Sequence, residues 1–276
     1  MFSLDGYQAV QKKGGVVRRT DRRVLAISGA DRAAWLQGLV TNDVASIAEG
    51  ENRYAAYLTP QGRMITDMHV AAQGHRLLLD VPAPLVSALR DKLDALIFAE
   101  DVQVTDESGR ILVWTIVDDT FTDVVSETLP AEYKSLPEID LDTFEVIRIE
   151  RGVPKFLADM NEDTIPLEAG IEDRAISFTK GCYVGQEVIV RVTTRGGGRV
   201  AKRLVRWHAD DSASVVPMPD SRIFSSGKDI GRVTSSAFSP SVNKVVGLGY
   251  VHRDFVEPGN QITIVWNDAP IKAVVR

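Results

Sequence analysis

The sequence predicts an α+β protein that ends in a compact antiparallel sheet or small barrel. Three observations carry this prediction. A meander of short β-type runs covers residues 52–81, a helix-type apolar pattern follows it, and residues 204–275 hold only short β-rich runs separated by Gly, Pro, Ser and Asn. The 276 residues, of which 44% are hydrophobic, are enough for one large core or two to three smaller ones.

The first fifty residues predict the order strand, strand, helix. Residues 16–19 and 24–27 are short β-type runs, and Ser28 stands where a helix N-cap is expected. The helix then runs through Trp35 to about Gly38. After the meander, a helix from Pro84 to Ile97 is predicted because Leu85, Leu89, Leu93 and Leu96 recur at three- and four-residue steps.

The middle of the chain predicts a connector between two units. Residues 118–145 carry nine acidic residues and one lysine, which favours a short helix and irregular chain. A helix is predicted at 143–151 with Asp142 as its cap. The glycine-rich run 195–199, just before the β-rich C-terminal part, predicts a hinge.

Charge is unevenly distributed along the chain. The net charge is −6 and the pI about 5.3, so a general attraction to polyphosphates is excluded and no stable, direct nucleic-acid binding is expected. Residues 180–205 nevertheless carry a net charge of +5. The alternative to a binding role for this basic segment is a solvated surface.

Several classes of protein are excluded by what the sequence lacks. No apolar run approaches the roughly 18 to 20 residues of a membrane helix, and residues 1–5 lack a signal-peptide pattern, so a cytoplasmic protein without membrane contact is expected. The single cysteine, Cys182, excludes an internal disulfide. The four histidines lack ligand spacing, so no metal site is expected, and Gly247-Leu248-Gly249 is too short for a nucleotide-binding fingerprint.

The most informative segment is the octet Lys180-Gly181-Cys182-Tyr183-Val184-Gly185-Gln186-Glu187. It predicts a tight loop that opens a helix over residues 186–192. Free backbone N–H groups, the helix dipole and Lys180 would each favour the thiolate of Cys182. The alternative is that Cys182 is a small buried residue and Tyr183 a core aromatic.

The octet resembles the K-G-C-[FY]-x-G-Q-E signature of the YgfZ-type proteins, a folate-binding family implicated in iron–sulfur enzyme maturation and related to the T-protein (aminomethyltransferase) of the glycine cleavage system. Five further segments match that family's motifs in the family's order: Trp35–Asp43, Leu58–Asp67, Arg148–Pro154, Ile165–Gly170 and Gly231–Ser235.

The resemblance implies a T-protein-like arrangement of three lobes around a central opening. The first lobe comprises residues 1–48 plus 130–198 and carries the octet, a ferredoxin-like second lobe comprises residues 49–129, and a C-terminal antiparallel β-barrel comprises residues 199–276.

The resemblance also implies the site. Tetrahydrofolate, or a one-carbon derivative of it, is the expected cofactor, with Cys182 and Lys180 as the expected catalytic residues. Glu150 matches the pterin-binding glutamate, Tyr183 is a candidate wall for the pterin, and arginines of the basic segment are candidates for the anionic glutamyl tail. The full set of expected folate contacts is Glu150, Tyr183, Gln186, Arg191, Arg195 and Asp67, with Arg199 as a further candidate.

Two functions follow as hypotheses, and a folate-binding module without chemistry is a third alternative. The first is an accessory protein that supports the assembly or repair of iron–sulfur clusters in client enzymes, such as radical enzymes that modify tRNA, with folate and the client or assembly proteins as partners. Its thiol has three possible roles: shared cluster coordination, a redox or sulfur-transfer step, or attack on a one-carbon unit. The second is a folate-dependent aminomethyltransferase or demethylase. The T-protein has adjacent aspartates where this chain has Thr66-Asp67, which argues against the second.

Overall fold

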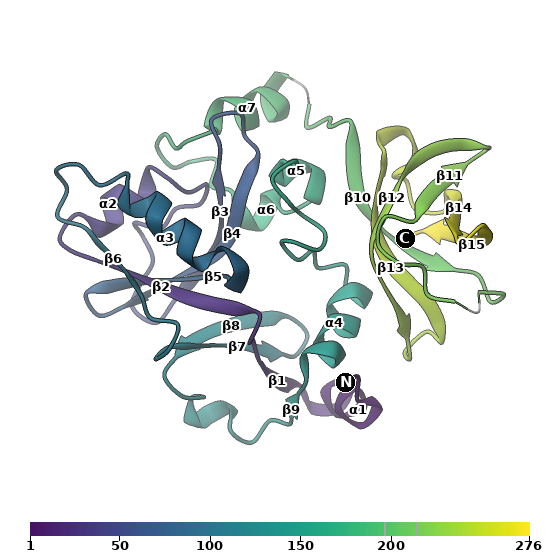
Figure 1. The fold of residues 1–276 in the computed structure, drawn as a ribbon, viewed down its shortest axis with the longest axis horizontal. Coiled ribbons are helices and arrows are strands. Elements are labelled where there is room, and N and C mark those ends of the chain that lie inside the picture. Colours follow the sequence, from purple (N-terminus) through teal and green to yellow (C-terminus); the bar gives the residue numbers. More distant parts are fainter. Residues whose placement is uncertain (196, 214) are drawn as a thin grey trace. The chain divides into compact units, whose positions relative to one another are not determined.

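The computed structural model describes residues 1–195, 197–213 and 215–276, and of Arg195 it describes the backbone alone. The described chain divides into two compact units (Figure 1). Unit 1 comprises Met1–Phe144 and Asp173–Gln186, and unit 2 comprises Glu145–Glu172 and Glu187–Arg276.

Unit 1 is built on two β-sheets. A five-stranded sheet has the strand order β3-β4-β5-β2-β6, and a four-stranded sheet has the order β8-β7-β1-β9. Neighbouring strands are antiparallel, except that β1 and β9 are parallel. The strands are β1 Gly15–Arg18, β2 Arg22–Ser28, β3 Asn52–Leu58, β4 Met64–Gln73, β5 Arg76–Pro82, β6 Gln103–Asp106, β7 Leu112–Val117, β8 Phe121–Ser126 and β9 Glu138–Ile139.

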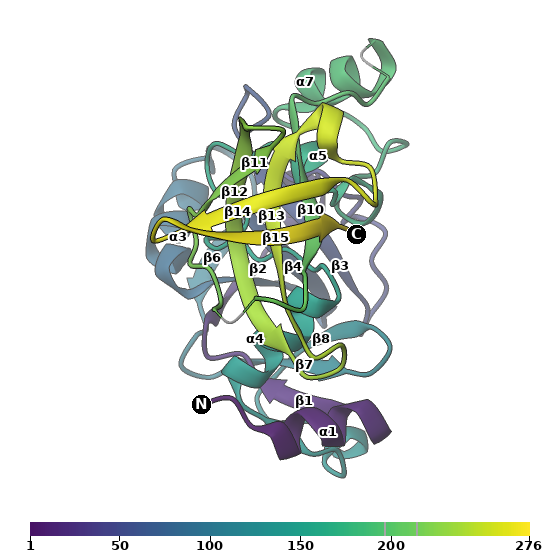
Figure 2. The same cartoon turned by 90° about the vertical axis from the view of Figure 1, so that its right-hand side faces the viewer.

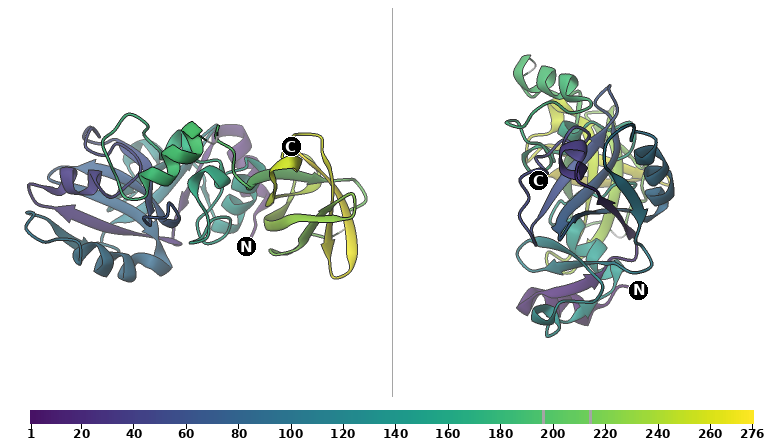
Figure 3. Two further views of the ribbon diagram at one scale, coloured as in Figure 1. Left: turned by 90° about the horizontal axis from the view of Figure 1, so that it is seen from above. Right: turned by 90° about the vertical axis from the view of Figure 1, so that its left-hand side faces the viewer.

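Helices cover one face of the five-stranded sheet. These are α2 (Arg32–Gln37), drawn in purple, and α3 (Val86–Asp94), drawn in blue (Figure 3). Leu36 of α2 and Leu93 of α3 join one core with Leu25 and Ile27 of β2. Because side chains alternate along a strand, the neighbouring β2 residues Val24 and Ala26 point to the other face.

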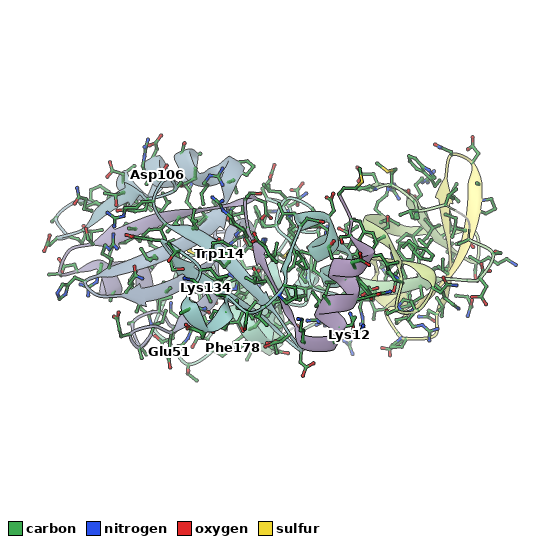
Figure 4. The ribbon with its side chains drawn as sticks, turned by 90° about the horizontal axis from the view of Figure 1, so that it is seen from below. Lys12, Glu51, Asp106, Trp114, Lys134 and Phe178 are labelled. Carbon is green, nitrogen blue, oxygen red and sulfur yellow. The ribbon has the colours of Figure 1, made fainter. Side chains whose placement is uncertain are left out.

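The second face of this sheet packs against the four-stranded sheet. Val24 and Ala26 cluster there with Val113 of β7 and Val125 of β8. On β7 the next residue, Trp114 (Figure 4), joins a separate small core with Val16. The space between the two sheets is therefore partly apolar, and its remainder is occupied by the charged network described below.

The helices outside this layer have four to ten residues. Unit 1 begins with α1 (Leu4–Lys13), which packs against β1 and β9 and adds a helix to the predicted order. The Ser3 hydroxyl caps it by accepting a hydrogen bond from the Gly6 N–H at 3.0 Å. The remaining α-helices are α4 Leu141–Glu150, α5 Pro166–Ala169, α6 Glu172–Ala175 and α7 Gln186–Val190, and a π-helical stretch, Arg191–Arg195, follows α7.

Unit 2 contains a closed six-stranded barrel with the order β10-β13-β12-β11-β14-β15 (Figure 2). Its interior is filled by apolar side chains around the fully buried Trp207. The predicted fold class, α+β with a C-terminal antiparallel β-barrel, is confirmed. The strands are β10 Lys202–Ala209, β11 Arg222–Ser225, β12 Lys228–Ser239, β13 Lys244–His252, β14 Gln261–Trp266 and β15 Ala269–Val275.

Packing inside the barrel explains why the first residue of Gly247-Leu248-Gly249 is a glycine. A Cβ at this position of β13 would lie 2.2 Å from the Trp207 ring and 2.4 Å from the Ser235 carbonyl oxygen. Both distances are far below van der Waals contact, so only glycine lets β13 cross the indole. The motif is a packing device of the barrel.

Gly247→Ala is therefore expected to destabilise the barrel by about 1–3 kcal/mol, the typical effect of overpacking a core. Denaturant unfolding monitored by tryptophan fluorescence measures this change. Gly109→Ala is the control, because no heavy atom lies within 4 Å of a Cβ there. Equal stability of the two variants would contradict the packing argument.

Four local predictions were wrong. The acidic stretch 118–145 contains β8 and β9, since β8 pairs with β7 and buries Asp123 and Val125 despite the acidic composition. The N-cap of α2 is Asp31, because Ser28 is still part of β2. Asp140 caps α4 by accepting the Thr143 N–H at 2.8 Å, in place of Asp142.

The fourth difference concerns helix length. Residues 83–85 form a 3₁₀ turn before α3, and α3 ends at Asp94 rather than Ile97. The predicted hinge includes Gly196, which lies outside the described residues; beyond it, Gly197 and Gly198 have φ values of 58° and 74°. The three-lobe boundaries stay a prediction. No helix within the described residues is long and apolar enough to cross a membrane.

Candidate functional site

The octet forms a loop in unit 1 that Lys180 anchors. Its ammonium donates hydrogen bonds to three backbone carbonyls, those of Gln37 at 2.6 Å, Val40 at 2.7 Å and Asn42 at 2.8 Å. Burial lowers the pKa of Lys180 to about 8, and the Asp43 carboxylate opposes that shift. All three ammonium protons face carbonyl oxygens, so Lys180 ties the octet to the chain after α2.

Gly185 brings a third segment to the same place. Its φ is 84°, and a Cβ there would lie 2.5 Å from the Thr59 carbonyl oxygen and 3.3 Å from the Gly62 Cα. The adjacent Val184 N–H donates to the Gly38 carbonyl at 3.3 Å. The β3–β4 turn, the end of α2 and the octet, which are far apart in the sequence, therefore meet in unit 1.

The Thr41-Asn42-Asp43 segment, which follows α2, is hydrogen-bonded to α6 and to β3. The Thr41 hydroxyl donates to the Ala175 carbonyl at 2.6 Å. The Asn42 side chain donates to the Tyr54 carbonyl at 2.8 Å and to the Arg174 carbonyl at 2.9 Å. These bonds join α2, β3 and α6 without any charged group.

Cys182 is exposed at the tip of this fixed loop. Its neighbour Tyr183 is buried, and the Lys180 Nζ lies 5.3 Å from the centroid of the Tyr183 ring. Burial raises the pKa of Tyr183 to about 12. Phe178, just before the octet, is 56% exposed (Figure 4). The loop thus buries Tyr183 and exposes the thiol of Cys182 to solvent. The exposed apolar side chain of Phe178 lies four residues earlier in the sequence.

Asp67 lies elsewhere in unit 1, on β4 between the two sheets. It is only 4% exposed, and its two oxygens accept hydrogen bonds from Arg22 Nη1 and the Tyr54 hydroxyl, each at 2.9 Å. The Arg174 guanidinium stacks on the Tyr54 ring at 4.7 Å from its centroid. Asp67 is therefore a member of a buried network whose other members the motif search did not identify.

The network continues through β5 and β8. Arg22 also donates from Nε to Asp80 Oδ1 at 2.5 Å. His69 Nδ1 lies 3.5 Å from Asp80 Oδ2 and 2.8 Å from Asp123 Oδ2. Burial lowers the pKa of His69, but the two carboxylates more than reverse this effect and raise it to about 9. We call Arg22, Asp67, His69, Asp80 and Asp123 the buried network.

Sequence reasoning missed most of the buried network for a clear reason. Its residues come from four strands, β2, β4, β5 and β8, and no local motif joins them. The one available signal was the position of charged residues inside β-type runs, because such residues are seldom buried without partners.

In unit 2, Glu150 is the last residue of α4. Its Oε1 accepts a hydrogen bond from the Ser241 hydroxyl at 3.3 Å, and its backbone carbonyl accepts from Arg206 Nη1, also at 3.3 Å. Glu150 is partly exposed, in contrast to Arg148 two residues earlier, whose guanidinium is buried against Asp159.

The basic segment of unit 2 borders a hollow of about 440 Å³ that three arginines line, Arg199, Arg203 and Arg253. Arg203 is paired with Glu172 at 2.7 Å. Arg191 is exposed on the π-helical stretch, Gln186 is partly exposed at the start of α7, and the side chain of Arg195 lies outside the described part of the chain. Unit 1 thus holds Lys180, Cys182, Tyr183, Gln186 and Asp67, and unit 2 holds Glu150 and the arginines.

Comparisons with known proteins agree with these features. Residues 202–276 match the family model of the glycine cleavage T-protein C-terminal barrel domain. An iron–sulfur cluster assembly factor IBA57 homolog, mitochondrial, from Phaeosphaeria nodorum is 30% identical over 241 residues, which are 74% of this chain and 58% of the relative. The chain thus spans less than two thirds of that relative's length.

Two aminomethyltransferases are similar over nearly the whole chain. That of Thermoanaerobacter pseudethanolicus is 22% identical and is matched over 99% of this chain and 87% of its own. The crystal structure of the glycine cleavage system aminomethyltransferase T from Bartonella henselae superposes with a TM-score of 0.83 at 15% identity, covering 99% of this chain and 88% of that one. Residues 202–276 therefore carry the T-protein barrel domain, and the whole chain has the fold of the aminomethyltransferase T structure.

Proposed function

We propose that the protein is a tetrahydrofolate-binding accessory factor that supports the assembly or repair of iron–sulfur clusters in client enzymes, with Cys182 as its functional thiol. The observation that carries this proposal is the exposed thiol on a loop held by three Lys180 hydrogen bonds and by the close approach at Gly185. The relatives named as iron–sulfur cluster assembly factors support the same role.

The fixed loop favours binding of a partner, because a thiol that is already held in place does not have to be ordered when the partner binds. Ordering a loop on binding costs free energy, and the Lys180 bonds have already ordered this one. A single thiolate cannot hold a cluster alone, so a coordinating role requires ligands from a partner or from a second copy of the chain. The client and assembly proteins are therefore the expected macromolecular partners.

Folate binding is proposed through the residues that the family resemblance implies. The partly exposed Glu150 carboxylate has the acceptor oxygens that pterin ring N–H groups need. Tyr183 and Gln186 of the octet and Asp67 are the further proposed contacts, and Arg191, Arg195 and Arg199 are proposed to receive the anionic glutamyl tail. The hollow in unit 2 is lined by Arg199 and Arg253, by Arg203, which Glu172 already pairs, and by Asp254, so Arg199 and Arg253 are its arginines offered to an anionic ligand.

Aminomethyl transfer is the second candidate, and the surroundings of Asp67 make it the weaker one. Both oxygens of this carboxylate already accept hydrogen bonds from Arg22 and Tyr54. A methylamine donor and tetrahydrofolate incubated with the purified protein test this alternative. Turnover that persists in Cys182→Ser would favour it over the accessory role. Cytoplasmic localisation stays a prediction, and two relatives carry the word mitochondrial in their names.

Cys182→Ser is expected to abolish support of cluster assembly while leaving tetrahydrofolate affinity within about twofold of wild type. The measurements are reconstitution of a [4Fe–4S] client, such as a radical tRNA-modifying enzyme, and calorimetric titration of tetrahydrofolate. Glu187→Gln is the matched control, because Glu187 is an exposed residue of the same octet. Full support of the client by Cys182→Ser would refute the role of the thiol.

Glu150→Gln is expected to weaken tetrahydrofolate binding by about tenfold or more, since a hydrogen bond to a charged group contributes roughly 1.5–3 kcal/mol. Glu257→Gln, at an exposed barrel position, serves as control. The absence of binding to the wild-type protein would remove folate from the proposal. Equal affinity of wild type and Glu150→Gln would remove Glu150 alone.

A further inference from the structure

His69, Asp80 and Asp123 form a cluster of metal-ligating groups within unit 1. They come from β4, β5 and β8, and one donor atom of each lies within 4.8 Å of the other two. Asp80 is fully buried and Asp123 is 8% exposed. The cluster contains none of the octet residues and none of the proposed folate contacts, although Arg22 joins Asp80 to Asp67.

Two of the three donor atoms of the cluster lack a hydrogen bond to the described part of the chain. Within the described residues, His69 Nδ1 and Asp80 Oδ2 have no hydrogen-bond partner, although Nδ1 lies 2.8 Å from Asp123 Oδ2 and 3.5 Å from Asp80 Oδ2. A buried polar atom without a hydrogen bond is costly and rare in native proteins. The donor lobe of the imidazole therefore points at neither carboxylate oxygen.

This spacing suits a bridging ion. Around an ion bound at roughly 2.0–2.2 Å from nitrogen and oxygen, the ligand atoms lie about 3 to 3.5 Å apart and off each other's donor axes. The measured separations of 2.8 Å and 3.5 Å lie close to this range. The geometry of a direct hydrogen bond would instead place the carboxylate oxygen on the axis of the ring nitrogen.

The second oxygen of each carboxylate has a partner that fixes its orientation. Asp80 Oδ1 accepts from Arg22 Nε, and Asp123 Oδ1 accepts from the Thr115 hydroxyl. Thr115 in turn accepts from Arg19 Nη1 at 3.2 Å. Outer partners of this kind orient the carboxylates of metal sites and leave the inner oxygens free for the ion.

The charge of the surroundings favours a cation. Four carboxylates belong to the cluster or lie next to it, those of Asp21, Asp67, Asp80 and Asp123. They face two guanidinium groups, those of Arg19 and Arg22. Because its pKa is about 9, His69 is protonated at neutral pH, and a bound ion must displace that proton; two negative charges then remain in a largely buried space. A divalent cation balances them, whereas an isolated buried charge is strongly unfavourable.

We propose that His69 Nδ1, Asp80 Oδ2 and Asp123 Oδ2 bind a divalent first-row transition metal ion. One imidazole and two carboxylates form a nitrogen and oxygen donor set that suits ions such as Zn²⁺, Fe²⁺ and Mn²⁺. Three protein ligands leave at least one coordination position for water. His69 is the most exposed of the three residues and provides the route of entry. The proposal depends neither on folate nor on Cys182.

Zn²⁺ is the first probe, titrated calorimetrically into chelator-treated protein that carries Cys182→Ser, so that the exposed thiol cannot contribute. One Zn²⁺ per chain is expected, and Asp123→Asn in the same background is expected to weaken binding by at least about tenfold. Asp254→Asn is the matched control, because His252 Nδ1 and Asp254 Oδ2 form an exposed pair at 3.4 Å. Binding that is lost equally in Asp254→Asn, or retained in Asp123→Asn, overturns the proposal.

A measurement without ligand substitutions covers the case in which Asp123→Asn fails to fold. Substoichiometric Mn²⁺ is expected to broaden the ring signals of His69 in the NMR spectrum before those of His75, His208 and His252. If His69 keeps sharp signals while Mn²⁺ is added, or if Zn²⁺ does not bind, the cluster is a protonated ion pair and the metal site is refuted.

Discussion

Replacing Arg22 with methionine is expected to lower the free energy of unfolding by about 3–5 kcal/mol, the effect of removing one partner of a buried ion pair. Arg22 is buried, and it donates to Asp67 Oδ1 at 2.9 Å, to Asp80 Oδ1 at 2.5 Å and to the Asp80 carbonyl at 2.8 Å. Methionine has a similar length and no donors, so two buried carboxylates and one carbonyl lose their partner. Equilibrium unfolding in urea measures the loss.

Two further variants identify the origin of that loss. Arg222→Met removes an exposed pair with Asp229, whose shortest contact is 2.6 Å, and is expected to change stability by less than about 1 kcal/mol. Combining Arg22→Met with Asp80→Asn is expected to recover part of the stability, because one unpaired carboxylate has become neutral. If Arg22→Met behaves like Arg222→Met, the buried network is hydrated and its charges are not energetically coupled.

Replacing Arg148 with methionine is expected to destabilise unit 2 by a similar amount, about 3–5 kcal/mol. Arg148 is 3% exposed and binds the fully buried carboxylate of Asp159. It also donates to Glu145 Oε2 at 2.8 Å and to the Ser235 hydroxyl at 2.8 Å, which joins α4 to β12. In the variant Asp159 keeps the hydroxyl groups of Thr234 and Ser235 and the backbone N–H of Lys155, none of which neutralises its charge.

Hydrogen exchange locates this effect, since the two arginines lie in different units. Arg148→Met is expected to raise exchange in α4 and β12, and Arg22→Met in β2, β4 and β5. Arg148→Lys keeps the charge but not the planar fork, so it is expected to recover only part of the stability. A variant Arg148→Met with wild-type stability and unchanged exchange would show that Asp159 does not need the guanidinium.

The Arg148 variants also help to test Glu150 as a folate contact. Arg148 and Glu150 belong to one sequence motif, yet the structure gives them different surroundings. Arg148 is a buried structural residue of unit 2, whereas Glu150 is partly exposed and hydrogen-bonded to Ser241. Loss of folate binding in Arg148→Met would therefore report lost structure, and the same loss in a stable Glu150→Gln would report a lost contact.

Local chemistry was readable from the sequence where neighbouring residues decide the structure. The β-rich C-terminal runs predicted the barrel, because short alternating strands with turn residues between them have few other solutions. Prediction failed where a tertiary partner overrode composition. β8 carries acidic residues and was expected to be irregular, but pairing with β7 and burial of Asp123 beside His69 make it a strand.

The sequence by itself determined the fold class, the C-terminal barrel and the relationship to the T-protein, because these depend on periodicity and on motifs of consecutive residues. It also singled out Cys182 as the lone thiol. Only the tertiary structure decided that Lys180 anchors the octet through three carbonyls, that Asp67 is enclosed by Arg22 and Tyr54, and that His69, Asp80 and Asp123 converge. Each of these contacts joins residues far apart in the chain, and strand order and register, which no local pattern specifies, bring them together.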